Sequence, residues 1–286
     1  MKEKHSLSVI VVNYNTCSWL TGCLASLERW APNAECWVVD NASSDGGISE
    51  AIKKFPKIHW ILNQENRGFA AANNQALMQA TGKWIWLLNP DTELHGPIAP
   101  WLEELSGWPA AGIIGSRLIY PDGRIQLSWG RTPHLFTEAM QRNYWNFLER
   151  DVNGGQKTLR RLAGKPRRVG WVLGASLLIR RETFEAIGPM DERFHMYFEE
   201  VDWCLRARAC RWEVLFHPGL TVTHWKGKAA SQNPEGMLLA YRKSQLLFYQ
   251  KHHGVWAASL LKGYLHLKFR NHPLRKQLFE SLREIP

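Results

Sequence analysis

Residues 83–93 of the chain are Lys-Trp-Ile-Trp-Leu-Leu-Asn-Pro-Asp-Thr-Glu, and this stretch decides the fold that we expect. Its apolar run, Trp84–Leu88, is typical of a strand buried inside a parallel sheet. Pro90 stops that strand, so Asp91 and Glu93 follow its carboxyl end. In open α/β sheets ligands bind outside the carboxyl ends of the strands, where a carboxylate can hold a hard cation and the cation can hold phosphates. The alternative is an ordinary turn, because Asn, Pro and Asp are all turn formers.

The segments before this stretch repeat one order, in which a strand is followed by a polar loop and a helix. Strands are predicted over Leu7–Val12, Cys36–Val39 and Ile58–Leu62, and an Ala-rich helix over Phe69–Ala80. Such a series of βαβ units predicts an α/β fold with a mostly parallel sheet and right-handed crossovers.

Polar side chains follow each of these strands at the point where the strand ends. They are Asn13, Asp40, Asn63, Asn89 and Asp91. Several such residues at equivalent positions predict a polar site along one edge of the sheet. The first strand is followed by no Gly-x-Gly-x-x-Gly, and the chain has no Gly-Lys-Ser/Thr loop, which disfavours dinucleotide oxidoreductases and P-loop enzymes. Phosphate is therefore expected to be held by a metal or by side chains.

The second half has a weaker pattern. Trp129–Arg168 shows no clear period and is predicted to be an insertion of loops and short helices that ends in a basic run. Val169–Ile179 is predicted to be one buried strand, with small residues that allow a close approach. Further elements are predicted as a hairpin or strand and turn over 113–127, a helix over Arg181–Ile187, and short strands over Trp212–Phe216 and Leu220–Thr223.

Three carboxylates, Glu199, Glu200 and Asp202, begin a further predicted helix. Acidic residues at a helix start are favoured by the helix dipole, which is one explanation. The other is catalytic, because carboxylates beside apolar and aromatic residues suit a general base with a raised pKa. His224 follows a strand in the same way as the polar residues above, and is either a ligand or a structural histidine.

The charge of the 286-residue chain is uneven. Its net charge is +10, but Lys157–Arg168 holds six basic residues and no acidic one, and Lys226–Pro286 holds seven lysines and four arginines against three glutamates. Nucleic acid, anionic lipid and a phosphorylated substrate are the candidate partners of such basic segments. The five cysteines are odd in number and lack metal-site spacing, and no run resembles a signal peptide or a membrane span, so a reduced, cytoplasmic protein is expected.

From Gly236 onward the tail is predicted to be helical. Its apolar residues, Trp256, Leu260 and Tyr264 among them, are interleaved with basic ones such as Lys262. A basic amphipathic helix with aromatic residues suits an anionic membrane surface. The alternative is a pair of helices that pack on the core and leave a solvated basic face.

Together these residues resemble bacterial family 2 glycosyltransferases, and within them the rhamnosyltransferase-like group of surface polysaccharide and O-antigen assembly. The matching stretches occur in the family's order over residues 7–230. They are Val11-Val-Asn-Tyr-Asn15, Val39-Asp-Asn-Ala-Ser-Ser-Asp45, Asn66-Arg-Gly-Phe-Ala70, Leu87-Leu-Asn-Pro-Asp-Thr92, Gly174-Ala-Ser-Leu-Leu-Ile179, Met190-Asp-Glu-Arg-Phe194, Tyr197-Phe-Glu-Glu-Val-Asp-Trp-Cys204, His217-Pro218 and Val222-Thr-His224.

This resemblance implies the GT-A fold, which is a Rossmann-like, mostly parallel sheet with flanking helices. Residues 1–115 would be the nucleotide-sugar-binding half, 116–230 the acceptor-binding and catalytic half of the same domain, and 231–286 C-terminal basic amphipathic helices. The implied donor is a nucleotide-diphosphate sugar, with dTDP-rhamnose expected before UDP-sugars, and the implied cofactor is Mg²⁺ or Mn²⁺.

The resemblance also implies roles for single residues at the donor site. Asp40 would meet the nucleotide base, with the loop of Asn13 and Tyr14 beside it. Asn41 would belong to the same nucleotide-sugar site, and Arg67 would lie near the nucleotide.

Asn89-Pro90-Asp91 stands where the family has its Asp-x-Asp motif, so Asp91 would hold the metal, with Asn89 beside it. His224 matches a second metal ligand of some members. The family's base is the second residue of a Glu-Asp pair, which here is Glu199-Glu200, so Glu200 would be the base. The longer side chain is a departure that keeps Glu199 and Asp202 as alternatives.

One base without a second nucleophile predicts a single displacement, and therefore inversion at the anomeric carbon. The expected acceptor is a lipid-linked glycan at the inner face of the cytoplasmic membrane, where the protein would lie peripherally. The basic run Lys157–Arg168 would meet a lipid diphosphate or be a solvated loop. The alternatives are a nucleotidyltransferase that makes a nucleotide sugar, and a non-catalytic basic module for membrane or RNA. No nucleic-acid partner is expected.

Overall fold

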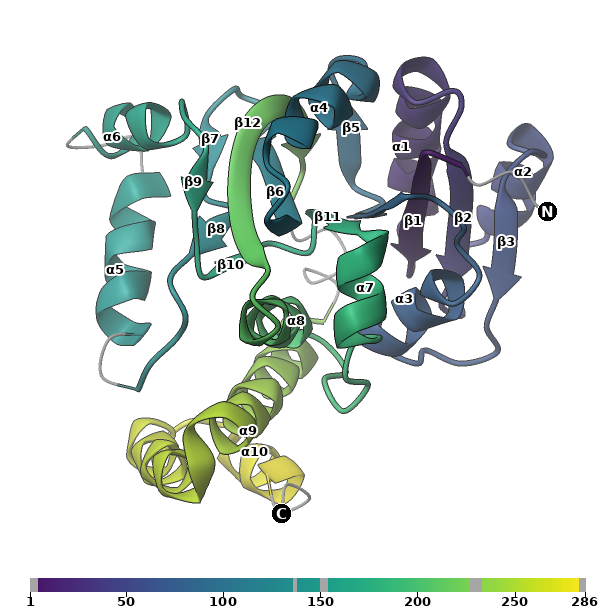
Figure 1. Ribbon diagram of the computed structural model, residues 1–286. Coiled ribbons are helices and arrows are strands. Elements are labelled where there is room, and N and C mark those ends of the chain that lie inside the picture. Colours follow the sequence, from purple (N-terminus) through teal and green to yellow (C-terminus); the bar gives the residue numbers. More distant parts are fainter. Residues whose placement is uncertain (1–4, 136–137, 150–153, 227–232, 283–286) are drawn as a thin grey trace.

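The computed structural model describes residues 5–135, 138–149, 154–226 and 233–282, apart from the side chains of residues 139 and 142 (Figure 1). The strands are β1 Leu7–Asn13, β2 Glu35–Asp40, β3 His59–Leu62, β4 Trp84–Leu88, β5 Thr92–Leu94, β6 Ala111–Ile119, β7 Ile125–Gln126, β8 Trp129–Gly130, β9 Arg167–Arg168, β10 Trp171–Val172, β11 Ser176–Arg180 and β12 Glu213–His224. The helices are α1 Cys17–Trp30, α2 Ile48–Lys54, α3 Phe69–Leu77, α4 Ile98–Glu104, α5 Glu138–Glu149, α6 Gly155–Leu162, α7 Arg181–Ile187, α8 Glu199–Ala209, α9 Pro234–Lys268 and α10 Arg275–Ser281, with a 3₁₀ turn at Leu105–Gly107.

One twisted sheet runs through the body of the molecule in the order β3-β2-β1-β4-β11-β6-β12-β5. Its first four strands are parallel, which confirms the predicted βαβ series. β11 is antiparallel to both of its neighbours and joins the two halves of the sheet. The predicted boundary at residue 115 falls inside β6, while that at residue 230 lies outside the described residues.

Two apolar layers cover the sheet. One face packs on α1, α2 and α4, and the other packs on α3, α7 and α8. The central strands are buried along their whole length: all seven residues of β1 and all five of β4 are buried. Because both faces are covered, these strands are almost continuously apolar rather than alternating. Apart from Ser8, whose hydroxyl donates to Glu35, their polar residues stand at or just after the strand ends.

The prediction of a single strand over Val169–Ile179 is wrong. The chain turns at Leu173–Ala175, where the N–H of Ser176 donates to the carbonyl oxygen of Leu173 at 3.3 Å. Only β11 joins the main sheet, and β10 pairs with β8 instead. Gly174 and Ala175 are small enough to make this turn.

The prediction of two short strands over 212–223 is also wrong, because β12 is continuous from Glu213 to His224. Pro218 has no N–H for the ladder, and the register against β6 shifts between Phe216 and Thr221 without ending the strand. A further short strand, β5, follows the Asn-Pro-Asp turn and was not expected. It pairs with the end of β12 and brings Thr92 opposite His224.

The insertion over 129–168 contains α5 and α6, in agreement with the short helices expected there. The basic run within it is not a loop, since α6 covers Lys157 and β9 ends at Arg168. Few apolar residues mark α6, because it buries Gln156, whose amide exchanges hydrogen bonds with the backbone of Ile125, and Leu159.

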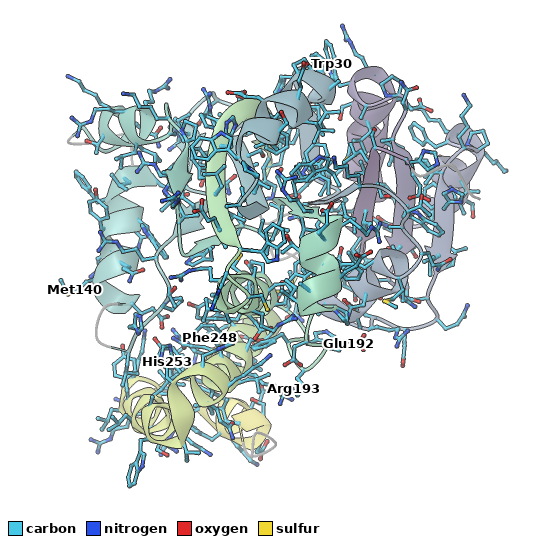
Figure 2. The ribbon with its side chains drawn as sticks, viewed as in Figure 1. Trp30, Met140, Glu192, Arg193, Phe248 and His253 are labelled. Carbon is cyan, nitrogen blue, oxygen red and sulfur yellow. The ribbon has the colours of Figure 1, made fainter. Side chains whose placement is uncertain are left out.

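The C-terminal helices α9 and α10 form their own layer beside α8 (Figure 1). The first part of α9 packs Phe248 and Tyr249 against the chain around Phe198, and Figure 2 places Phe248 and His253 where α9 meets the body. α9 is kinked at Gly254, whose φ is +82°. Within the described residues, no helix combines the length and apolar character that crossing a membrane requires.

Candidate active site

The carboxyl ends of β1 and β2 hold a buried polar cluster around Asp40. The register places Asn13 beside Asp40, and the Asn13 amide donates to the Asp40 carboxylate at 2.8 Å. Ser43 adds two further hydrogen bonds to the same carboxylate, one from its backbone N–H at 3.0 Å and one from its hydroxyl at 2.6 Å. The carboxylate is thus held rigidly at the strand ends, where a ligand of the sheet would lie.

Asn41 fixes the next loop along the edge. Its side-chain oxygen accepts from the Asn63 amide at 3.0 Å and from the backbone N–H of Arg67 at 3.1 Å. Its own amide donates to Asn66 at 2.8 Å. The buried Asn41 is therefore a support for the loop, while the side chains of Tyr14 and Arg67 are exposed and make no hydrogen bond or ion pair within the described residues. These two side chains are available to a ligand.

The turn after β4 and the end of β12 meet. His224 Nε2 lies 3.3 Å from Asp91 Oδ1 and 3.4 Å from the Asn89 amide nitrogen, and the Asp91 and His224 side chains are both buried. The Trp225 N–H donates to the carbonyl oxygen of Asp91 at 3.0 Å and closes the turn against β12. The structure thus brings together the three residues that the sequence placed at a metal site.

The orientation of His224 favours a ligand role. Its Nδ1 lies 3.0 Å from Gln126 Oε1, so an N–H at Nδ1 leaves the Nε2 lone pair facing Asp91. A lone pair and a carboxylate at that distance suit a shared cation, and imidazole and carboxylate together are ligands that Mn²⁺ accepts. No cluster of three His, Cys, Asp or Glu side chains suited to a metal occurs within the described ranges. The two residues fit a cation that completes its coordination with ligand oxygens and water.

Glu199 and Glu200 form a second buried carboxyl pair at the start of α8. Burial raises the pKa of both side chains, and the neighbouring Glu200 charge raises that of Glu199 further. The backbone N–H groups of Glu200, Val201 and Gly174 oppose the effect at Glu200, yet burial dominates and raises its pKa to about 7. One oxygen of each carboxyl has no hydrogen-bond partner in the described structure. A carboxyl with such a pKa can accept a proton near neutral pH.

Asp202 is directed away from this pair. Its carboxylate contacts Arg206 at 2.9 Å and, on α9, Lys251 at 2.6 Å and His252 at 2.7 Å. Burial raises the pKa of Asp202, but the hydrogen bonds from His252 and Lys251 and the cationic charges around it lower the pKa below the ordinary range. The geometry therefore ties Asp202 to α9, whereas Glu199 and Glu200 have no cationic partner in the part of the chain that the structure describes.

Two backbone contacts join the clusters. The Asn89 N–H donates to the Ala175 carbonyl oxygen at 3.0 Å, and Gly174 lies beside Glu200, so the turn at 174–175 connects the metal-site turn with the glutamate pair. At the other end, the Phe69 N–H donates to the His195 carbonyl oxygen at 2.7 Å.

Sequence reasoning missed Ser43, Gln126 and His195. Ser43 lies within the motif of residues 39–45, so its spacing from Asp40 could have suggested that it binds this carboxylate. Gln126 lies in a predicted hairpin, and nothing in the sequence marks it as the partner of a histidine 98 residues away.

The sequence matches the family described as Glycosyl transferase family 2 over residues 8–165. It is 30% identical over 279 residues to the N-acetylglucosaminyl-diphospho-decaprenol L-rhamnosyltransferase of Mycobacterium tuberculosis, an alignment that covers 92% of this chain and 91% of that relative.

Among solved structures, GalNAc-T7 with UDP, GalNAc and Mn²⁺ is similar with a TM-score of 0.60 and 17% identity over 87% of this chain, which spans 48% of that structure. The mannosyltransferase PcManGT from Pyrobaculum calidifontis, in complex with GDP-Man and Mn²⁺, is similar with a TM-score of 0.57 and 17% identity. That alignment covers 99% of this chain and 74% of PcManGT.

Proposed function

The chain belongs to glycosyl transferase family 2 and has the GT-A fold of its structural neighbours, and from this premise we propose a reaction for its site. The proposed enzyme moves a sugar, L-rhamnose first among candidates, from a dTDP- or UDP-sugar to a hydroxyl of a lipid-linked glycan, with inversion. Its place would be in polysaccharide or O-antigen assembly.

The observation that carries this proposal is the pairing of two opposite environments at one sheet edge. Asp91 and His224 make a polar pair that could hold a cation, whereas Glu199 and Glu200 have no cationic partner among the described residues. The turn at 174–175 connects them, because Ala175 accepts from the N–H of Asn89, which lies beside His224, and Gly174 lies beside Glu200. Group transfer from a diphosphate needs both functions, because the leaving group must be stabilised and the incoming hydroxyl must lose its proton.

In the proposed mechanism Asp40 and Asn13 bind the nucleotide base, and Asn41 holds the loop that carries Arg67 beside the nucleotide. Asp91 and His224 would hold the divalent cation, Mg²⁺ or Mn²⁺, and the cation would supply Lewis-acid stabilisation of the diphosphate.

Glu200 accepts the proton of the acceptor hydroxyl, and Glu199 is the alternative base. The hydroxyl oxygen then bonds to the anomeric carbon on the face opposite to the nucleoside diphosphate. The bond to the diphosphate breaks, and the configuration at that carbon is inverted.

The lipid-linked acceptor is supported by the M. tuberculosis relative, whose name gives L-rhamnose as the sugar and N-acetylglucosaminyl-diphospho-decaprenol as the substrate. That relative aligns over nearly its whole length, including the region of the glutamate pair.

We also propose a peripheral position on the anionic inner face of the cytoplasmic membrane. The second part of α9 exposes a stripe of apolar side chains, of which Trp256 is 87% and Leu267 77% exposed. Exposed Lys268 and Arg270 follow at its end. An apolar stripe next to cationic residues suits a bilayer that carries anionic lipid.

The first experiment measures thermal stabilisation by UDP, dTDP and GDP, each with and without Mg²⁺ or Mn²⁺. The wild type is compared with Asp91→Ala and with Glu93→Ala, a matched control because Glu93 is an exposed carboxylate of β5 two residues further on. A nucleotide at a hundred times its Kd should stabilise the wild type by about 2.7 kcal/mol.

A metal-dependent shift for one nucleotide, lost in Asp91→Ala and kept in Glu93→Ala, is the expected result. A thermal shift that is the same with and without metal, and the same in Asp91→Ala as in the wild type, would refute the metal role of Asp91. No shift with any nucleotide in the wild type would count against the proposed donor class.

A further inference from the structure

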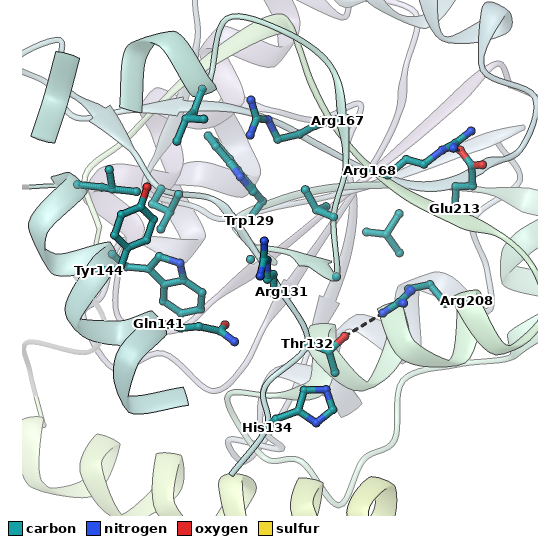
Figure 3. A pocket seen from close by; sticks show the side chains of 18 of the residues that line it. Trp129, Arg131, Thr132, His134, Gln141, Tyr144, Arg167, Arg168, Arg208 and Glu213 are labelled. Carbon is teal, nitrogen blue, oxygen red and sulfur yellow. Dashed lines mark hydrogen bonds and ion pairs between the residues drawn. The ribbon is translucent and has the colours of Figure 1, made fainter. Parts of the chain in front are cut away.

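A separate cavity of about 1410 Å³ lies beside the insertion (Figure 3). Its walls come from α5 and the end of α6, from β8 and β9, from the start of β12, and from the last turn of α8 with the residues after it. None of the residues that line it belongs to the Asp40, Asp91 or Glu200 clusters.

The cavity is strongly cationic. Five arginines line it against one carboxylate, Glu213. That carboxylate is paired with the exposed Arg168 at 2.8 Å, so it neutralises only one of the five. The remaining members are Arg131, Arg167, Arg208 and Arg211.

Most of these guanidinium groups have no anionic partner within the described residues. Arg208 donates to the hydroxyl of Thr132 at 2.8 Å, the contact drawn in Figure 3. Arg167 packs its guanidinium 5.8 Å from the ring centroid of Trp129, and its buried Nε has no hydrogen-bond partner. Figure 3 shows Arg131 near the middle of the view, between Trp129 above it and Thr132 below it. An arginine cluster whose one carboxylate is already paired can bind an anion.

The rim of the cavity is apolar. Met140 and Tyr144 lie one turn apart on α5, line the opening, and are 72% and 52% exposed. Figure 2 shows Met140 on the outer side of α5, away from the sheet. Phe147, one turn further, is also exposed. A cavity lined by arginines, with exposed apolar residues beside it, suits a ligand with an anionic head and a hydrocarbon tail.

Helix α8 connects the cavity with the proposed transfer site, and the distance between them is short. Glu200 lies in its first turn and Arg208 in its last, eight residues later, which corresponds to about 12 Å along the helix. A second connection runs through the chain, since Gly170 lines the cavity and Gly174 lies beside Glu200.

We propose that this cavity binds the diphosphate of the lipid-linked acceptor, with the first part of the hydrocarbon chain along the exposed face of α5. The proposal rests on the proposed function and adds a subsite to it. Arginine suits this ligand because its planar fork can bind phosphate oxygens in pairs. The acceptor sugar would then extend from the cavity along α8 toward Glu200.

The test uses farnesyl diphosphate, a water-soluble isoprenoid diphosphate, as the probe in titration calorimetry. Arg131→Gln removes an exposed guanidinium that has no partner in the described structure, so folding should be unaffected. The double variant Arg131→Gln/Arg167→Gln extends the change to the half-buried Arg167. Arg29→Gln is the matched control, because Arg29 is an exposed arginine of α1 on the opposite face of the sheet.

Farnesyl diphosphate should bind the wild type and Arg29→Gln equally, and the double variant at least tenfold more weakly. Farnesol should bind none of them measurably, since it lacks the diphosphate. The KM for the lipid-linked acceptor should rise in the double variant while the KM for the donor stays the same. Equal farnesyl diphosphate binding by the wild type, Arg29→Gln and the double variant would overturn the proposal.

Two further measurements are needed. One tells a lipid-linked diphosphate from a phospholipid headgroup, and the other tells the cavity proposal from the donor proposal. Sedimentation with phosphatidylglycerol vesicles should be unchanged in the Arg131→Gln/Arg167→Gln variant. A loss of vesicle binding that matches its loss of farnesyl diphosphate binding would assign the cavity to phospholipid headgroups instead. The calorimetry needs no turnover, so it reports on the cavity even where nucleotide produces no thermal shift. A missing nucleotide shift alone refutes the donor proposal.

Discussion

Replacing Glu200 by Gln is predicted to slow sugar transfer by about 10²- to 10⁴-fold and to make the folded chain more stable at alkaline pH. The Glu200 side chain is buried, and burial raises its pKa from the ordinary 4.5 to about 7. One pKa unit corresponds to about 1.4 kcal/mol, so holding the ionised carboxylate in the folded state costs about 3 kcal/mol. Gln keeps the shape of the side chain and removes the charge.

The sign follows from the two protonation states. Below about pH 4.5 the carboxyl is protonated in both the folded and the unfolded chain, and its titration does not affect stability. As the pH rises from there to about 7, the unfolded chain loses the proton while the folded chain keeps it, so the wild type loses stability. Gln does not titrate, and the Glu200→Gln variant escapes this loss. Removing the Glu200 charge also relieves Glu199, whose pKa it helps to raise.

Urea unfolding of the metal-free protein at pH 5 and pH 8 measures the effect. The advantage of Glu200→Gln over the wild type should grow by about 2 to 3 kcal/mol between these pH values. Glu185→Gln, which changes an exposed carboxylate of α7, is the control and should show no such growth. The same difference at both pH values would refute the raised pKa. A variant that is no more than a few times slower than wild type would refute the base role, since losing a general base costs about 10²- to 10⁴-fold.

Three further outcomes are expected. The kcat/KM of the wild type should rise with pH and level off above about 7, as Glu200 ionises; a flat profile from pH 5.5 to 8.5 would contradict this. Gly68→Ala should lower the melting temperature more than Gly46→Ala. Both glycines have a φ near +80°, but only at Gly68 would a Cβ lie 2.5 Å from His195 Nδ1. Equal losses in melting temperature would show that the contact with His195 does not matter. Asp202→Asn should cost about 1 to 3 kcal/mol in urea unfolding, since the half-buried Arg206 and His252 lose their carboxylate while Lys251 keeps its contact with Asp191. The kcat of the folded fraction should stay within a few-fold of the wild type, and a collapse of kcat would restore Asp202 as a candidate base.

The strand-end residues could be predicted because they depend on local pattern. A strand covered on both faces is continuously apolar, so Asn13, Asp40 and Asn89 are visible as the first polar residues after such runs. The parallel order then places them on one edge without further information. The meeting of Asp91 with His224 depended on the resemblance to a family, and its geometry required β12 to end opposite β5.

The remaining features depend on contacts between distant parts of the chain. The sequence shows Asp202 as one of three carboxylates at a helix start, and only the packing of α9 reveals that Lys251 and His252 bind it. The cationic cavity is likewise hidden, because Arg131, Arg167 and Arg208 lie up to 77 residues apart and converge through the pairing of β9 with β12 and the course of α8. Sequence pattern records which residues end an element, but not which distant elements those residues meet.

These contacts give α8 three connections along a single helix. Its first turn holds Glu200, the carboxylate of Asp202 binds Lys251 of α9, and its last turn reaches the arginine cavity. Lys251 lies three residues before the kink at Gly254, beyond which α9 exposes its apolar stripe. If that stripe rests on the bilayer, the buried ion pair fixes the height of α8, and so of Glu200, above the lipid surface. An acceptor held by its diphosphate in the cavity would then present its sugar to the base at a distance that the helix itself sets.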